Sequence, residues 1–409
     1  MRHVAIFMFP GYGHVNPTLE FSRILVGLGH RVTHVVDERH AAAVAAVGAE
    51  AVVYASRRTR LGDGAVTGED IGALGLHFLR ESMEVILPRT MEAFRDDVPD
   101  LVLHDLESFF TARTAARAWH RPTAQLFPYV ASNEHFSLAQ EVFDGATENV
   151  QRCIDLLTEH LTARGEEPDA VWSFMANFSD RNLVLLPREF QPRGETFDER
   201  FTFVGHSLGS GQPDTGSWVP PADGRPVVLI TLGTEVNDHP DFFRACGSAF
   251  ADAGWHVVMT VGPGNLPAGP PPVAHVEIHE WIAFRTVLPH AAAVVCHAGM
   301  STMLEALYFN TPLVVVTWTP EDRVNGARTE ALGLGRTLPG EGLEPARLRG
   351  LVEEVAADRD VRRSVTRMRA AMLAAGGPAR AALVIEDWLA QAPDPAEARP
   401  AGALVGDRR

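Results

Sequence analysis

The sequence predicts an α/β protein built from two doubly wound domains, with a parallel sheet in each domain and a cleft between them. Three observations lead to this fold class. Short apolar runs alternate with helical stretches, the alternation breaks once in a segment rich in Gly, Pro and Ser, and it then restarts. The length of 409 residues also exceeds one ordinary core and suits two domains of about 200 residues each.

Four apolar runs in the first half have the composition of buried strands. They cover residues 3–9, 30–36, 49–55 and 99–105. A helical pattern fills the interval 16–30. We expect Asn16 as its N-cap, Pro17 at its first helical position and Gly29 near its end. Uninterrupted apolar strands joined by helices are typical of a parallel sheet that is covered on both faces.

The second half repeats this organisation after a linker at residues 209–224. Its strand-like runs cover residues 225–234, 255–262, 275–282, 291–299 and 311–318. We therefore expect an N-terminal domain over 1–208 and a C-terminal domain over 225–392, whose last helix can pack back on the N-terminal domain. Residues 393–409 have the composition of a disordered tail. Ligands of such folds lie at the carboxyl ends of the strands, here facing the interdomain cleft.

Composition argues against several classes of function. The formal net charge is −16 and no basic stripe is present, which makes nucleic acid and anionic membranes poor partners. The chain contains no lysine, so neither a Schiff base nor a Walker-type phosphate lysine is available. Its three cysteines are dispersed, and neither a signal peptide nor an apolar run of about 18 residues is present. We expect a soluble cytoplasmic protein, and the sequence leaves a homodimer open.

The segment VVCHAGMSTMLEALYFNTPLVVV, residues 294–316, is the most informative part of the chain. A strand leads through His297 into a turn of small residues and then into a helix. Free N–H groups at the helix start, a hydroxyl of Ser301 or Thr302 and the imidazole of His297 would suit a diphosphate. Glu305, one turn further on, is placed to accept hydrogen bonds from a ribose. The alternative is an ordinary strand–turn–helix with His297 as a packing residue.

The segment FPGYGHVNPTLEF, which starts at Phe9, places a histidine and two glycines directly after the first strand. On the sequence alone His14 is a core residue, a metal ligand or a catalytic base. A neutral imidazole can take a proton from a hydroxyl at cellular pH, and Gly11 and Gly13 would let the chain turn beside a bulky acceptor. The run reads GxGxxxP and lacks the third glycine of a dinucleotide fingerprint, so it supports NAD binding only weakly.

Several segments together resemble the GT-B glycosyltransferases of secondary metabolism, of the macrolide and enediyne-antibiotic type. They are GHVNPTLE, PDLVLHD, FTFVG, VVLITLGT and the motif at 294–316, and they spread over nearly the whole chain. FQPRGETFDERFTFVG, DHPDFFRACGSAF and WHVVMTVG look closest to the calicheamicin type. The resemblance implies two Rossmann-like domains and the inverting transfer of a sugar from a nucleotide sugar, without a metal or a further cofactor.

The resemblance also assigns roles to individual residues. His14 matches the catalytic base, and Asp105 matches the carboxylate that orients it and stabilises its imidazolium. Trp281 matches the aromatic side chain that stacks on the nucleobase, and the backbone of Ile282 matches a contact to the base edge. The matches to the diphosphate site are Gly233, Thr234, His297, Gly299, Ser301 and Thr302, and Glu305 matches the ribose acceptor.

Two departures from the family pattern bear on the donor. Glu321 and Asp322 stand where relatives that use glucose carry Asp and Gln, and an ionised acid pair cannot donate hydrogen bonds as Gln does. Phe284 replaces an amide near the nucleobase. We therefore expect a dTDP-linked deoxy- or aminosugar, transferred to a hydroxyl of a hydrophobic natural product such as an enediyne or macrolide antibiotic.

Other functions stay open at this point. One is a UDP-glucose-type enzyme that inactivates a macrolide for self-resistance. Another is an NAD(P)-dependent oxidoreductase, with Asp37 as the acid after the second strand. A non-catalytic binding protein of the same fold is disfavoured by the joint presence of His14 and Asp105, and a sugar-nucleotide epimerase by the acceptor-side histidine motif.

The acceptor site is expected in the less regular parts of the N-terminal half and should be hydrophobic. Its candidate residues are Gly13, Phe78, Met83, Phe127, Tyr129 and Phe136. A metal site is not expected. The DxD motif formed by Asp358 and Asp360 lies between two helical stretches, and we interpret Asp360 as a helix cap.

Overall fold

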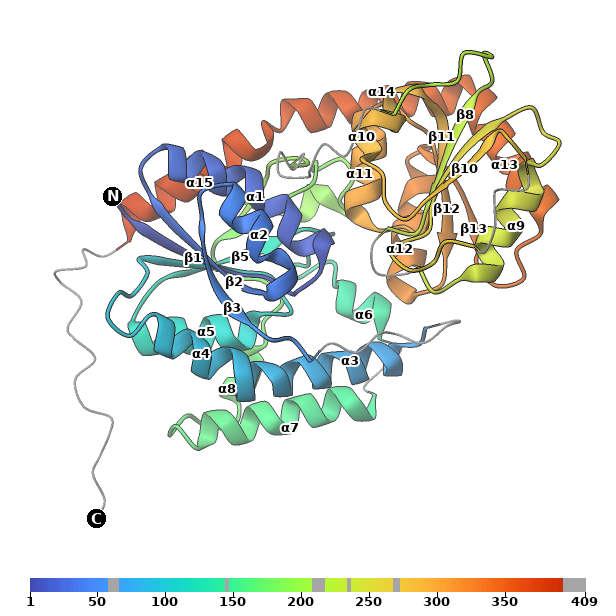
Figure 1. Ribbon diagram of the computed structural model, residues 1–409. Coiled ribbons are helices and arrows are strands. Elements are labelled where there is room, and N and C mark those ends of the chain that lie inside the picture. Colours follow the sequence, from blue (N-terminus) through green and yellow to red (C-terminus); the bar gives the residue numbers. More distant parts are fainter. Residues whose placement is uncertain (58–65, 144–146, 208–217, 234–236, 268–272, 393–409) are drawn as a thin grey trace.

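A computed structural model describes residues 1–57, 66–143, 147–207, 218–233, 237–267 and 273–392 (Figure 1). Within these residues the chain forms two parallel sheets, one in each half, and the two domains lie side by side (Figure 1). The prediction of an α/β protein with two doubly wound domains is confirmed.

The N-terminal domain contains one sheet and the helices that cover its faces. Its strands are β1 (His3–Phe7), β2 (Arg31–Asp37), β3 (Glu50–Tyr54), β4 (Leu101–His104), β5 (Thr123–Phe127), β6 (Asn182–Val184) and β7 (Phe201–Phe203). Its helices are α1 (Tyr12–Gly27), α2 (Glu38–Ala46), α3 (Gly68–Glu81), the π-helical turn η1 (Ser82–Ile86), α4 (Leu87–Ala93), α5 (Phe109–Trp119), α6 (Leu138–Val142), α7 (Glu148–Thr162), α8 (Ala170–Phe174) and the 3₁₀ turn η2 (Gly194–Thr196).

The C-terminal domain repeats the arrangement. Its strands are β8 (Val227–Thr231), β9 (His256–Thr260), β10 (Val276–His279), β11 (Ala291–Cys296), β12 (Leu313–Thr317) and β13 (Gly335–Pro339). Its helices are α9 (Pro240–Phe250), α10 (Phe284–Val287), the 3₁₀ turn η3 (Leu288–His290), α11 (Met300–Tyr308), α12 (Pro320–Ala331), α13 (Pro345–Ala357) and α14 (Arg359–Ala374). A last helix, α15 (Gly377–Gln391), follows α14.

Both sheets reverse their strand order at one point. The first sheet has the order β3-β2-β1-β4-β5-β6-β7 and the second has the order β10-β9-β8-β11-β12-β13. The order therefore reverses between β1 and β4 in one domain and between β8 and β11 in the other. In open α/β sheets, ligands bind outside the carboxyl ends of the strands at such a switch point.

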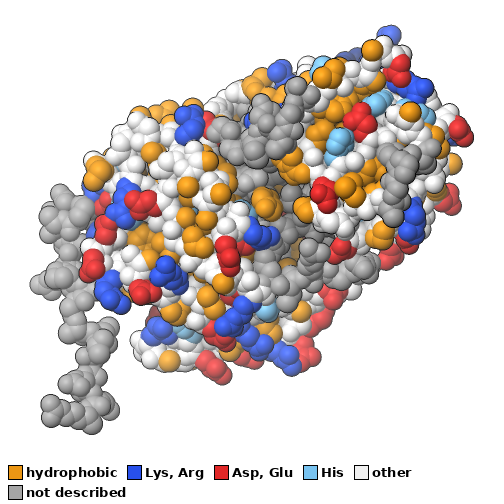
Figure 2. Space-filling model, in the orientation of Figure 1, with side chains coloured by type: hydrophobic (Ala, Val, Ile, Leu, Met, Phe, Trp, Pro, Cys, Tyr) orange, Lys and Arg blue, Asp and Glu red, His pale blue; other side chains and the backbone are white. Residues whose placement is uncertain are grey.

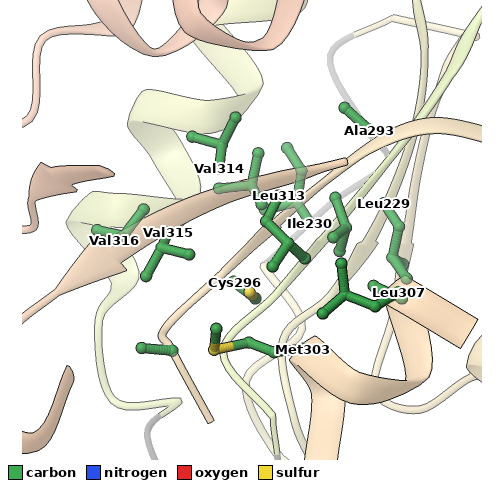
Figure 3. Close-up of a cluster of buried hydrophobic side chains, with 14 of the residues drawn as sticks. Leu229, Ile230, Ala293, Cys296, Met303, Leu307, Leu313, Val314, Val315 and Val316 are labelled. Carbon is green, nitrogen blue, oxygen red and sulfur yellow. The ribbon is translucent and has the colours of Figure 1, made fainter. Parts of the chain in front are cut away.

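The apolar composition of the strands follows from burial on both faces. All residues of β1 and of β8 are buried, as expected for central strands of parallel sheets. Figure 3 shows the result in the second domain, where Leu229 and Ile230 of β8 pack with Cys296 of β11 and with Met303 of α11. Each of the nine predicted runs contains an observed strand. The sequence reasoning missed β5, β6, β7 and β13, because these runs are short or carry polar residues.

Helix α1 begins earlier than predicted. Its N-cap is Gly11 and its first residue is Tyr12, so Pro17 lies inside the helix rather than at its first position. Proline at that place removes the N–H that would bond to the carbonyl four residues back, which is the carbonyl of Gly13. That carbonyl instead accepts a hydrogen bond from Ser301 Oγ of the other domain, 3.4 Å away. The predicted start was wrong because a tertiary partner compensates the bond that proline removes.

Besides the Ser301–Gly13 bond, a helix and an arginine join the two domains. Helix α15 returns to the N-terminal domain and packs on α1 (Figure 1). Arg328 of α12 donates hydrogen bonds to three consecutive backbone carbonyls of the N-terminal domain, at residues 189–191, over 2.7 to 3.0 Å. Because the guanidinium group satisfies three carbonyls at once, the loop before η2 is held against α12.

The packing of α15 predicts that its buried face stabilises a domain more than 350 residues upstream. Ile385 has no solvent exposure and packs in the core cluster of β1 and α1, whereas Leu383 on the same helix is 53% exposed. We expect Ile385→Ala to lower the free energy of unfolding by about 2–5 kcal/mol. Leu383→Ala is the matched control and should change it by about 0.5 kcal/mol or less. Urea unfolding of both variants measures this, and equal stabilities would contradict the packing of α15.

Candidate active site

The two switch points lie opposite each other. His14 and Asp105 follow the neighbouring strands β1 and β4, whereas Gly233 and His297 follow the neighbouring strands β8 and β11. The hydrogen bond from Ser301 to Gly13 joins the loop region after β11 to that after β1. The structure therefore brings the sequence-predicted base and the sequence-predicted phosphate segment to one interdomain site.

His14 and Asp105 form a hydrogen-bonded pair. The imidazole Nδ1 lies 2.8 Å from Asp105 Oδ2. Asp105 has no solvent exposure, and its oxygens also accept the backbone N–H groups of Phe9 (2.6 Å) and Ser108 (2.8 Å). These backbone donors fix the carboxylate, and the carboxylate in turn fixes Nδ1 of the imidazole. The other ring nitrogen, Nε2, is therefore the one available for a proton from a substrate.

Glu107 is a further acid at the base, and the sequence reasoning missed it. Its Oε2 lies 3.8 Å from His14 Nδ1 and accepts a hydrogen bond of 2.8 Å from the hydroxyl of Tyr129. The ring of Tyr129 meets the imidazole of His14 edge-on, with 5.5 Å between the ring centroids. The signal was available in the sequence, because Glu107 comes only two residues after Asp105 at the end of the same strand.

The acids around His14 control its protonation. Burial alone would lower the pKa of the imidazole, but the hydrogen bond to Asp105 and the charges of Glu107 and Asp105 outweigh it and raise the pKa to about 9. Glu321 of α12 adds to this effect from the other domain. Burial also raises the pKa of Glu321 itself to about 7, helped by the neighbouring charges of Asp322 and Glu107.

Two glycines lie so close to the imidazole of His297 that neither position has space for a side chain. A Cβ atom on Gly233 would lie 2.8 Å from its Cε1, and a Cβ atom on Gly299 would lie 2.7 Å from both Cε1 and Nε2. Gly233 also has a φ of +69°, which favours glycine. Any larger side chain at either position would displace the imidazole, so the two loops can approach it only because both residues are glycine.

The turn between β11 and α11 is held in an unusual conformation. Ala298 has a φ of +65°, in the left-handed region that a non-glycine residue rarely adopts. Its carbonyl accepts a hydrogen bond of 3.1 Å from the buried side chain of Asn325 in α12. Asn325 was not predicted as part of the site. It holds the turn from which His297 and the free N–H groups of α11 are presented.

Among the remaining donor candidates, Thr302 and Glu305 lie in α11, whereas Trp281 and Ile282 follow β10. Thr302 is buried in the first turn of α11, and Glu305 lies one turn further, where burial raises the pKa of its carboxyl to about 7 against the opposing charge of Arg285. Trp281 is half-buried and Ile282 is buried, and both follow β10. Thr234 lies outside the described residues.

Asp322 has a structural position that the sequence reasoning did not foresee. It forms a capping box with Thr319 at the start of α12, and its Oδ2 accepts the N–H groups of Trp318 (3.0 Å) and Thr319 (2.9 Å). The motif T-x-x-D in the sequence carries this signal. Of the two predicted acids, Glu321 is therefore the one whose charge acts on His14.

Ring contacts link three of the predicted acceptor residues to His14. Phe78 reaches it through Phe9, Tyr129 meets it directly, and Phe127 meets Tyr129. Phe78 is 6% exposed and meets the ring of Phe9 at 5.0 Å, whereas Met83 is half-buried in the π-helical turn η1. Phe127 was expected in an irregular segment, but it ends strand β5, is 1% exposed and packs in the core against Phe201. Phe136 is half-buried in the loop before α6, and α6 packs on α12 of the other domain.

Two groups of acidic side chains could suggest a metal site. The ligand atoms of His14, Asp105 and Glu107 lie within 4.8 Å of one another. Both oxygens of Asp105 already accept hydrogen bonds from the protein, so we interpret this group as a base with two acids. In the DxD motif, the cap of α14 is Asp358, whose Oδ1 accepts the N–H of Asp360 at 2.7 Å. The prediction of Asp360 as the cap was wrong, because Asp358 is the last residue with an extended backbone.

On the face in Figure 2, basic and acidic side chains are interspersed, and no basic patch is formed there. No helix in the described ranges is long and apolar enough to cross a membrane.

Comparisons with known proteins define the class. Residues 256–387 match the family described as Erythromycin biosynthesis protein CIII-like, C-terminal domain. The crystal structure of CalG4, the calicheamicin glycosyltransferase, is similar with a TM-score of 0.81 and 39% identity, over 96% of this chain and 99% of that chain. The protein is therefore a glycosyltransferase with the two-domain GT-B fold.

Two relatives narrow the class further. Demethyllactenocin mycarosyltransferase of Streptomyces fradiae is 37% identical over 96% of this chain and 87% of its own length. Oleandomycin glycosyltransferase of Streptomyces antibioticus is 34% identical over 99% of this chain and 95% of its own length. The chain belongs to the antibiotic glycosyltransferases of the macrolide and enediyne type, and the resemblance seen in the sequence is confirmed.

The position of Asp322 predicts a stability effect that its neighbour lacks. Asp322→Ala would leave the N–H groups of Trp318 and Thr319 without their acceptor, so we expect it to lower the free energy of unfolding by about 1–3 kcal/mol. Glu321→Gln is the control and should not lower it, because Glu321 is held among like charges. Chemical denaturation compares the two variants. An equal loss in both would show that Asp322 does not cap α12.

Proposed function

We propose that the protein is an inverting glycosyltransferase that moves a deoxy- or aminosugar from a dTDP-sugar to a hydroxyl of a hydrophobic natural product, such as an enediyne or macrolide antibiotic. The observation that carries the proposal is the buried Asp105–His14 pair opposite the glycine-lined turn of His297. The proposed compartment is the cytoplasm. No metal and no cofactor besides the nucleotide sugar takes part in the proposed reaction.

His14 is proposed as the general base. The hydroxyl of the acceptor gives its proton to Nε2 of the imidazole, while its oxygen forms the bond to the anomeric carbon. Asp105 stabilises the imidazolium that results, because its carboxylate accepts the hydrogen bond of Nδ1. Attack from the face opposite the leaving group inverts the configuration at that carbon.

The C-terminal domain is proposed to hold the nucleotide. The electron pair of the broken bond goes to the diphosphate, whose negative charge is stabilised by the N–H groups at the start of α11 and by His297. Gly233, Gly299, Ser301 and Thr302 complete this diphosphate site, with Thr234 from outside the described residues. Trp281 stacks on the base, Ile282 contacts its edge and Glu305 accepts hydrogen bonds from the ribose.

Glu321 is proposed to contact the sugar. It is the predicted acid whose charge reaches the base, and its ionised form accepts but does not donate hydrogen bonds. An amino- or deoxysugar suits such a group better than glucose does. One relative is named for the transfer of a mycarosyl group, which supports a sugar other than glucose.

The alternatives have less support. A UDP-glucose-type enzyme of self-resistance would use the same scaffold, and the donor screen below separates it from the proposal. For the NAD(P)-dependent oxidoreductase, the candidate acid was Asp37. Its two oxygens are engaged by His40 at 2.5 Å and by Arg39 at 2.7 Å, and the comparisons do not favour this function.

The proposed donor site predicts selective stabilisation by one nucleotide. Thermal unfolding should shift upward with dTDP, less with UDP and not with NAD or NADP, because only a ligand that binds the folded state stabilises it. Glu305→Ala should remove most of the shift. Stabilisation by UDP alone would favour the function of a self-resistance enzyme. Stabilisation by NAD or NADP alone would contradict the proposed glycosyl transfer and favour an oxidoreductase.

The proposed base predicts a pH dependence. Only the neutral imidazole can accept a proton, and the pKa of His14 is raised to about 9. The value of kcat/KM, which reports the free enzyme, should therefore rise with pH, reach half of its plateau near pH 9 and level off only above it. His14→Ala should lower kcat by about 10²–10⁴-fold and abolish this rise. A pH profile that is unchanged in His14→Ala would exclude His14 as the base.

A further inference from the structure

Glu107 is close to the base but is not part of the His14–Asp105 pair. Its Oε2 lies 3.8 Å from Nδ1 of His14, on the same side of the ring as Asp105. The side chain of Glu107 is 37% exposed, so it faces the site rather than the core. It belongs to the loop between β4 and α5 that also carries Asp105.

Tyr129 holds both partners in place. Its hydroxyl donates a hydrogen bond of 2.8 Å to Oε2 of Glu107, and the edge contact of its ring supports the imidazole of His14. Tyr129 is only 7% exposed, so its own position is fixed by packing. One buried phenol thus sets the distance between the second carboxylate and the base.

Asp105 does not use its whole negative charge to stabilise His14. Its carboxylate shares its negative charge among two backbone N–H groups and the imidazole. Donors of this kind stabilise the ionised carboxylate. They also reduce the electrostatic stabilisation that this carboxylate can give to an imidazolium partner. Glu107 accepts a hydrogen bond from Tyr129, and its charge also acts on His14 from 3.8 Å.

We propose that Glu107 is a positioning residue of the base: held by Tyr129, its carboxylate stabilises the imidazolium that His14 becomes when it takes the proton of the attacking hydroxyl. The inference rests on the proposed role of His14 and deepens it. The proton moves from the acceptor oxygen to Nε2, the new glycosidic bond forms, and the diphosphate leaves with the electron pair. Glu107 acts on the charge of the ring and does not touch the reacting atoms.

The charged groups around the ring come from both domains. Asp105 and Glu107 face it from the loop after β4, and Glu321 faces it from α12. Burial and the charge of Asp105 raise the pKa of Glu107, whereas the charge of His14 and the hydrogen bond from Tyr129, in the loop after β5, oppose this rise. A test must therefore measure the titration of His14 directly and change one of these groups at a time.

The test is an NMR titration of the His14 imidazole in the full-length protein, combined with the pH profile of kcat/KM. In Glu107→Gln the amide can still accept the hydrogen bond of Tyr129, but the negative charge is gone. We expect the titration midpoint of His14 and the rise of kcat/KM to move to lower pH by about 1 unit, with a several-fold lower kcat at the plateau. Tyr129→Phe should shift both in the same direction by less.

The control variant is Glu159→Gln, which removes an exposed carboxylate on α7. It should leave the titration and the pH profile unchanged. A His14 midpoint in Glu107→Gln that equals the wild-type value overturns the inference, whether or not activity falls. If His14→Ala stays active, the proposed base itself fails, so the two failures are distinguishable. Should Glu107→Gln not fold, Tyr129→Phe decides by the same midpoint.

Discussion

The buried carboxylate of Asp105 is the group on which the arrangement of the site depends. A charged group without solvent exposure must have its hydrogen bonds satisfied inside the protein. Asp105 meets this requirement by accepting the N–H of Phe9, the N–H of Ser108 and a hydrogen bond from His14. These donors belong to the segments after β1 and β4, so a single side chain fixes both loops at the first switch point. The orientation of the base is a consequence of this burial.

A hydrogen bond that compensates for a missing helical bond also joins the segment of His14 to α11. Pro17 removes one hydrogen bond from α1 and leaves the carbonyl of Gly13 to Ser301 of the second domain. Arg328 and α15 add contacts that cross between the domains away from this point. The two switch points are thus held opposite each other by polar contacts near the site and by apolar packing at a distance from it. The geometry suits a reaction in which one domain supplies the base and the other binds the leaving group.

Acidic side chains and potential anion-binding groups occupy different parts of the site. Acids gather around the base, where Asp105, Glu107 and Glu321 favour the protonated imidazole. In contrast, the proposed diphosphate segment presents glycine, histidine and the start of a helix, and it does so in a chain without lysine. An anion would be repelled from the first region and accepted by the second. In the proposed reaction, this division would orient a nucleotide sugar with its diphosphate toward α11 and its sugar toward the acids.

The sequence by itself determined the α/β class, nine of the strands and the two-domain organisation, because apolar runs and the break between them are local signals. The pairing of His14 with Asp105 was implied by the resemblance to a known family. Tertiary structure decided the rest. The start of α1 depends on Ser301, the burial of Phe127 on its place in β5, and the cap of α12 on the side chain of Asp322. Glu107 became visible only through its distance to His14 and its bond to Tyr129. Such contacts join residues far apart in the chain, and the pattern of one segment carries no information about the partner that another segment supplies.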